Sequence, residues 1–229
     1  SLDKKQSVAM NILEYAIMDA PGAPLKKALV DAGIGEDVFA SFDDGIRQTI
    51  FSIVARNANM SDKERFVSVI RDTLTDLSGH GEEGRAIDRT SIEAAINNFE
   101  FKHKEANFGR FPKGLMMGLD AFNTWLYDDA SALEMFKLNE VYDELKESLK
   151  TGYFEELIWE KLVQNTFGMI FVMKPKKGLD KENDAAEKQK LADYKASLTE
   201  NELEQVVSDT KELKLYQETP SPAEDMEKV

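Results

Sequence analysis

The spacing of apolar residues in the first 35 positions predicts one long and one short helix. Residues 3–19 repeat apolar side chains at the helical period, namely Val8, Ile12, Leu13, Ala16 and Ile17. Pro21 ends this helix, because proline cannot continue the hydrogen-bond ladder. In the stretch "PGAPLKKALVDAGIG", Pro24 suits a first helical residue and Gly33 suits a left-handed stop. We expect this short helix to form a packing corner between the long helix and the strands that follow.

Three segments rich in β-branched and aromatic residues predict strands. "DVFASF" (37–42) and "IRQTIFSIVARNA" (46–58) flank the turn signal "DDG", which is typical of an antiparallel hairpin. A third strand, "TFGMIFVMKP" (166–175), lies far along the chain and ends at Pro175. Because two strands and a distant third make a thin sheet, we expect that a further strand is missing at the N-terminal end.

Helical patterns occupy most of the remaining residues up to 165. Ser61 and Glu64 have the spacing of a capping box before a helix with apolar Phe66, Val67, Ile70, Leu74 and Leu77. Further helices are expected over 88–107, 113–127, 131–149 and 152–165. The predicted fold class is therefore α+β, a thin antiparallel sheet packed by several helices.

The composition changes after Pro175. Residues 176–218 are highly charged, with a thin apolar seam of Leu191, Tyr194, Leu198, Leu203, Val206, Val207, Leu213 and Tyr216. Thr199 is a suitable cap for the second of two helices. We predict an α-helical hairpin with a narrow buried edge, which needs a surface to lie on. The predicted domains are an α+β domain (1–175), this hairpin as a connector (176–218) and a linker tail (219–229).

Charge and composition exclude several classes of protein. The chain has 229 residues and a net charge of −14, which disfavours binding to nucleic acid. No apolar run is long enough to span a membrane, and the N-terminal segment is not a signal peptide. The chain has no cysteine, so a reducing compartment is expected. We favour the bacterial cytoplasm, with an organellar matrix as the alternative.

The histidines do not form a known catalytic motif. His80 and His103 are the chain's two histidines, and no HExxH, phosphate loop or GxSxG elbow is present. His103 extends an apolar stripe of Ile92, Ile96 and Phe99, so we interpret it as a packed residue that a carboxylate from another helix could hold. His80, Glu82 and Glu83 are interpreted as a solvated loop, with a weak cation site as the alternative. We therefore predict no catalytic, metal or cofactor-binding residues.

Several motifs together resemble one family. "APGAPLKKALVDAGIG", the hairpin after it, "FKHKEANFG" (101–109) and "TFGMIFVMKP" occur in an order similar to that in insulinase-type zinc peptidases of the presequence-protease branch. The resemblance is to their second domain and the helical-hairpin connector after it, and it covers nearly the whole chain. Pro24-Leu25 with Gly33 and Gly35, and Lys102-His103 followed by Phe108-Gly109, are its most specific parts.

The resemblance implies a scaffold and not a catalytic centre. Family members enclose peptides in a chamber between two halves, and their zinc lies in the first domain on an inverted His-x-x-Glu-His motif. This chain lacks that motif, so it would be an inactive, metal-free part of a zinc metalloendopeptidase. Its partners would be the remaining domains and, through the chamber, peptide substrates.

Two other interpretations of the function stay open. The chain could be a free-standing peptide-binding or adaptor protein, or, as a distant third, a hydrolase that uses His103 and a carboxylate. The Met- and aromatic-rich segment "GRFPKGLMMGLDAFNTWLYDD" (109–129) is either core or a peptide-contacting surface. The acidic excess is either an ordinary solvated surface or an attraction for basic peptides.

Overall fold

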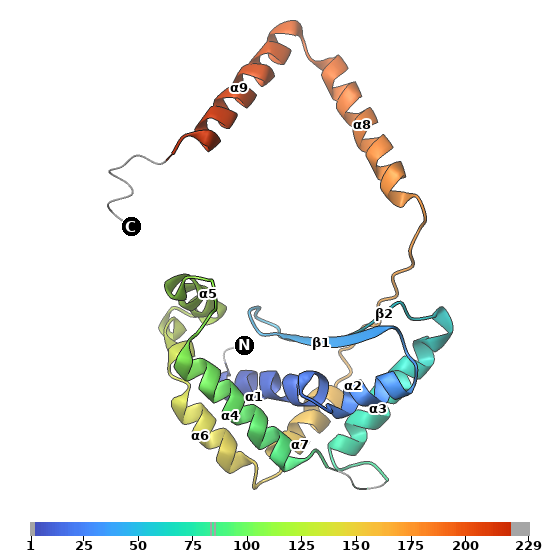
Figure 1. Ribbon diagram of the computed structural model, residues 1–229, viewed down its shortest axis with the longest axis vertical. Helices are drawn as coiled ribbons and strands as arrows, with labels where there is room; N and C mark the ends of the chain where they lie inside the picture. The colour runs from blue at the N-terminus through green and yellow to red at the C-terminus, as the bar shows by residue number, and fades with distance from the viewer. Residues whose placement is uncertain (1–2, 83, 85, 221–229) are drawn as a thin grey trace. The chain divides into compact units, whose positions relative to one another are not determined.

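The computed structural model describes residues 3–82, 84 and 86–220 and divides the chain into two units, Ser1–Gly168 and Met169–Val229 (Figure 1). Each unit is considered by itself. The first unit consists of α1 (Lys4–Glu14), the π-helical turn η1 (Tyr15–Asp19), α2 (Pro24–Asp31), β1 (Asp37–Asp43), β2 (Ile50–Arg56), the 3₁₀ turn η2 (Met60–Asp62), α3 (Lys63–Leu77), α4 (Arg89–Glu105), α5 (Lys113–Trp125), the 3₁₀ turns η3 (Asp129–Ser131) and η4 (Glu134–Phe136), α6 (Asn139–Ser148), α7 (Tyr153–Ile158) and the π-helical turn η5 (Trp159–Val163).

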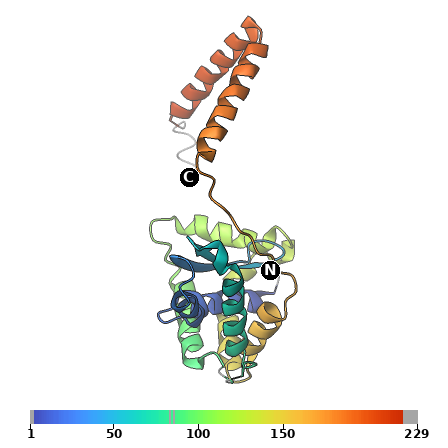
Figure 2. The ribbon, with the colours of Figure 1, turned by 90° about the vertical axis from the view of Figure 1, so that its right-hand side faces the viewer.

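Helix α1 lies at the centre of the first unit (Figures 1 and 2). It packs against α4, α6 and β1, and its predicted apolar stripe is buried, with Ile12 and Leu13 fully inaccessible. Asp3 caps the helix by accepting a hydrogen bond from the Gln6 amide over 2.9 Å. The stripe pattern in the sequence therefore located the centre of the core correctly.

The two strands form an antiparallel hairpin that alternates between a core face and an outer face. The register pairs Val38 with Ala55, Ala40 with Ile53 and Phe42 with Phe51, and all six side chains contact the core. The alternate pairs, such as Ser41 with Ser52, lie on the other face. The fold is thus α+β with a thin antiparallel sheet, as the sequence predicts.

Helix α2 forms the expected packing corner. It contacts η1, α3 and β1, and Leu25 and Leu29 are fully buried. Gly33 has φ +67°, the left-handed conformation expected at the end of this helix. The short helix therefore connects the long helix to the hairpin, which explains why so short an element is bracketed by proline and glycine.

Three local expectations are wrong. The capping box before α3 joins Asn59 and Asp62, because the additional turn η2 begins the helical segment earlier than Ser61. The helix expected over 131–149 begins only at Asn139, after η3 and η4. The strand expected over 166–175 does not form, since no strand among the described residues pairs with it, and Phe167 is 96% exposed.

The second unit contains two helices, α8 (Leu179–Ser197) and α9 (Glu200–Glu218), which diverge from a short turn (Figure 1). Thr199 caps α9 as predicted, because it accepts from the Glu202 amide while its own amide donates to Glu202 Oε2 over 2.8 Å. The expected narrow buried edge is absent from the described residues of this unit, where the seam is exposed and only Leu198 and Leu203 are half-buried. Two helices with one thin stripe each have too little apolar surface to close on each other.

Two further expectations have different outcomes. The boundaries proposed at residues 175 and 218 stay predictions, and most of the tail, from 221 onward, lies outside the described residues. Within the described part of the chain, no helix is both long and apolar enough to cross a membrane.

Candidate functional site

An exposed apolar stripe runs along α5. Leu115, Leu119, Phe122 and Leu126 follow one another at helical spacing, and about half or more of each side chain is exposed. The Trp125 indole extends this surface and stacks on Phe122, with ring centroids 5.6 Å apart and planes 8° from parallel. We call these five residues the α5 stripe. A contiguous exposed apolar surface of this kind is typical of a binding site.

The opposite face of α5 attaches the helix to the first unit. Ala121 and Thr124 are buried there, and the Thr124 hydroxyl donates to the Ser131 carbonyl over 2.7 Å. The helix packs on the two 3₁₀ turns η3 and η4. The interpretation of segment 109–129 as core is therefore wrong for the stripe residues, although the helix itself forms as expected.

His103 faces a carboxylate from another helix, as the sequence analysis anticipated. Burial lowers the pKa of His103, and the negative charge of Asp120 on α5 opposes that change. Burial likewise raises the pKa of Asp120, Asp44 adds to the increase, and His103 opposes it. The His103 ring also lies 5.9 Å from that of Tyr142 on α6. These contacts support a packing role in which His103 helps to position α5 and α6 against α4.

Asp44 connects this cluster to the centre of the fold. It accepts hydrogen bonds from the Ser7 hydroxyl and, over 3.0 Å, from the Asn11 side-chain amide, both on α1. The turn of the β-hairpin is thereby held to α1. No pattern in the sequence indicated this contact, because Asp44 lies in a turn more than 30 residues from its partners.

His80 does not form a cation site with its neighbours in the described part of its loop. Its ring stacks on Trp159 of η5, and its Nδ1 lies 3.1 Å from the Ser78 carbonyl oxygen. Glu82 is exposed, and Glu83 lies outside the described residues. Among residues 3–82, 84 and 86–220, no three His, Asp or Glu side chains are placed to hold a metal ion.

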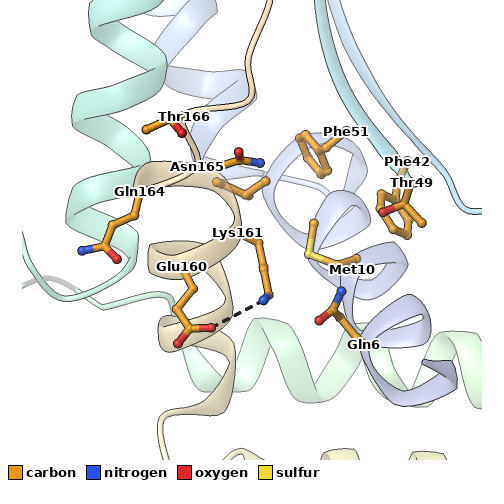
Figure 3. A pocket seen from close by; sticks show the side chains of 11 residues that line it. Gln6, Met10, Phe42, Thr49, Phe51, Glu160, Lys161, Gln164, Asn165 and Thr166 are labelled. Carbon is orange, nitrogen blue, oxygen red and sulfur yellow. Dashed lines mark ion pairs between the residues drawn. The ribbon is translucent and has the colours of Figure 1, made fainter. Parts of the chain in front are cut away.

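A pocket of about 410 Å³ lies beside the hairpin end of the sheet (Figure 3). Its apolar lining comes from Met10 on α1, Phe42 on β1 and Phe51 on β2. Its neutral polar lining consists of side-chain amides and hydroxyls, which belong to Gln6, Thr49, Gln164, Asn165 and Thr166. The two charged lining residues, Glu160 and Lys161, pair with each other over 3.6 Å. The pocket therefore combines an apolar floor with neutral hydrogen-bonding groups.

Comparison with known proteins gives a consistent family resemblance. The family model described as "Peptidase M-16C associated" matches residues 173–229. The chain is 35% identical to Protein HypA of Clostridium perfringens, with 99% of this chain and 23% of that protein aligned. It is 32% identical to Presequence protease 1, chloroplastic/mitochondrial, of Arabidopsis thaliana, with 97% and 21% aligned.

A vertebrate protein, Presequence protease, mitochondrial, of Xenopus tropicalis, is 25% identical over 96% of this chain. The chain spans less than a quarter of the length of each of these relatives. Across nearly its whole length, this chain resembles a segment of the insulinase-type presequence proteases that ends in their peptidase-associated region.

Proposed function

We propose that this chain is a non-catalytic segment of a zinc-dependent oligopeptidase, in which it supports the catalytic domain, forms part of a substrate chamber and links the two halves. The observation that carries this proposal is the alignment of almost the whole chain with less than a quarter of proteins named as presequence proteases. The residues of this chain that are described supply no metal ligand set.

The cleavage chemistry would belong to the rest of the parent polypeptide. Zinc-assisted hydrolysis needs a bound metal and a carboxylate that activates water. This chain has two histidines, and they face Trp159 and Asp120 in structural contacts. We therefore expect the isolated chain to bind no stoichiometric zinc and to cleave no peptide.

The α5 stripe is the surface that we assign to peptide contact. Its five apolar side chains suit the apolar side chains of an unfolded peptide, and the net charge of −14 would attract basic peptides. Basic peptides with apolar side chains are a suitable substrate class for such a surface. The name of the Arabidopsis relative, a protease of presequences, agrees with that class.

A binding experiment tests this assignment. A fluorescently labelled, basic amphipathic peptide is titrated with the chain, and its anisotropy is measured at low and high salt. We expect binding that weakens with salt and is lost in the Phe122→Ser, Trp125→Ser double variant. The matched control is Leu213→Ser with Leu215→Ser, which removes two exposed apolar residues from the second unit. Equal binding by both double variants would contradict the assignment.

Metal analysis tests the absence of catalysis separately. The purified chain is exposed to zinc, dialysed and measured by mass spectrometry of the metal. Substoichiometric zinc is expected, and one tightly bound zinc per chain would overturn the proposed scaffold role.

A free-standing peptide-binding or adaptor protein is the second candidate, and the exposed α5 stripe supports it equally. The two candidates differ in what the reading frame encodes upstream. A His-x-x-Glu-His motif there favours the peptidase, whereas a frame without it favours the adaptor. For the peptidase we propose a bacterial cytoplasmic location, with an organellar matrix as the alternative, because the relatives are bacterial and organellar.

A further inference from the structure

Strand β2 has one edge that is not paired. Within the residues that the structure describes, the sheet contains β1 and β2 alone, so the backbone groups of β2 that point away from β1 have no strand partner. Unpaired strand edges readily accept another strand. The free edge of β2 is therefore a candidate acceptor, and what lies beside it decides whether a strand would fit.

The pocket described above lies on the β2 side of the sheet. In Figure 3, Phe51 lies between Phe42 on β1 and the Asn165–Thr166 segment. Pocket-lining residues come from β2 and its approach, Thr49 and Phe51, and from the segment opposite, Asn165 and Thr166. The space between β2 and this segment is thus open and not filled by side chains.

The lining specifies the chemistry of an occupant. Phe51 and Met10 offer an apolar floor, and the amide and hydroxyl groups of the rim can bond to a peptide backbone. The charged pair Glu160 and Lys161 is already matched, so the pocket offers no charge for a charged ligand. An extended segment with apolar residues toward the floor and polar residues toward solvent meets all of these conditions.

We propose that this pocket is the seat of a third β-strand, which is supplied by another part of the longer polypeptide and pairs with the free edge of β2. The proposal rests on the proposed function, in which this chain is a segment of a larger protein. The relatives aligned with this chain are more than four times its length, so they have polypeptide available to supply such a strand. The same insertion would place a partner beside the exposed residue Phe167.

The test uses hydrogen exchange on the 229-residue chain with a defined probe. The probe is a synthetic peptide of alternating valine and threonine with one lysine at each end, which is a generic extended strand. At saturation, we expect the β2 amides that point away from β1 to exchange about tenfold more slowly, while the amides of α6 do not change. A matched peptide with proline at its central positions should give no protection.

Two protein variants and one sizing measurement complete the test. Phe51→Thr keeps a β-forming residue but removes the floor of the pocket, so protection should be lost, whereas Ser52→Thr on the outer face should retain it. If neither peptide protects β2, the proposal is wrong. If light scattering shows a dimer whose β2 is already protected, a second copy occupies the site, and the external strand is overturned. None of these outcomes depends on Phe122 or Trp125, so a failure here is distinct from a failure of the proposed peptide surface.

Discussion

The imidazole of His80 stacks on the indole of Trp159, with ring centroids 4.0 Å apart and planes 10° from parallel. Through this contact the loop after α3 is held against η5, and α3 and η5 also pack directly. An aromatic pair contributes about 0.5–1.5 kcal/mol beyond the area that it buries. We therefore expect His80→Ala to lower the free energy of unfolding by about 1 kcal/mol in urea denaturation. His80→Phe should restore most of that loss, and an alanine variant as stable as the original chain would contradict the prediction.

Glu14 should make stability depend on pH between about 4.5 and 7. Burial raises the pKa of Glu14 to about 7, and the charge of Asp19 adds to the increase. Because the folded-state pKa is the higher one, the folded state favours the protonated carboxyl, and this contribution is lost as the pH rises through 7. Glu14→Gln should therefore stabilise the chain at pH 8, by on the order of 1 kcal/mol because solvent screens a half-buried group.

The control for Glu14 is the same comparison at acid pH. Near pH 4.5 the side chain of Glu14 is already protonated in the folded state, so the variant and the original chain should differ little. Urea denaturation at both pH values measures the two differences. A stability gap that stays constant with pH would show that Glu14 titrates normally.

Gly33 and Gly35 should resist substitution for different reasons. Both have positive φ, +67° and +71°, which side chains with a β-carbon rarely adopt. A β-carbon at Gly33 meets open space, whereas one at Gly35 would lie 2.6 Å from the Arg56 carbonyl oxygen. We expect Gly33→Val to cost roughly 1 kcal/mol or more, and Gly35→Ala to cost at least as much because the end of β2 must also move.

Gly118 provides the matched control for these two glycines. It lies within α5, and a β-carbon there meets nothing within 4 Å. Gly118→Ala should be neutral or stabilise by about 0.5–1 kcal/mol, because alanine favours the helix. Thermal unfolding of all three variants is the measurement, and equal losses in all three would exclude the backbone explanation.

Limited proteolysis should cut the chain first between its two units. Phe167 and Phe171 are 96% and 81% exposed, and the surrounding residues 165–176 are in neither helix nor strand. Chymotrypsin should therefore cleave after these residues before it cleaves at Phe154, which is 1% exposed. Mass spectrometry identifies the early fragments, and an early cut within the core of the first unit would contradict this order.

The sequence predicts those parts of the fold that depend on near neighbours. The α1 stripe, the hairpin and the Thr199 cap each follow from residues within one element or one turn. The strand at 166–175 was wrong because a strand forms only when a partner edge is available, and its local composition contains no information on that partner. The stripe on α5 was ambiguous for the same reason, since an amphipathic pattern does not reveal what covers its apolar face. The contacts of His80 with Trp159 and of Asp44 with α1 join residues too far apart for any periodicity to reveal them.

The wide turn at Tyr15–Asp19 affects how this chain should be aligned with distant relatives. The Ala20 amide donates to the Tyr15 carbonyl five residues back, and Ala16, Ile17 and Met18 are buried in succession. A turn of this width accommodates one more residue than an α-helical turn does. A relative could therefore lack one residue here and keep a continuous helix, so a gap placed inside this helix is physically reasonable and the positions before and after it should be matched independently.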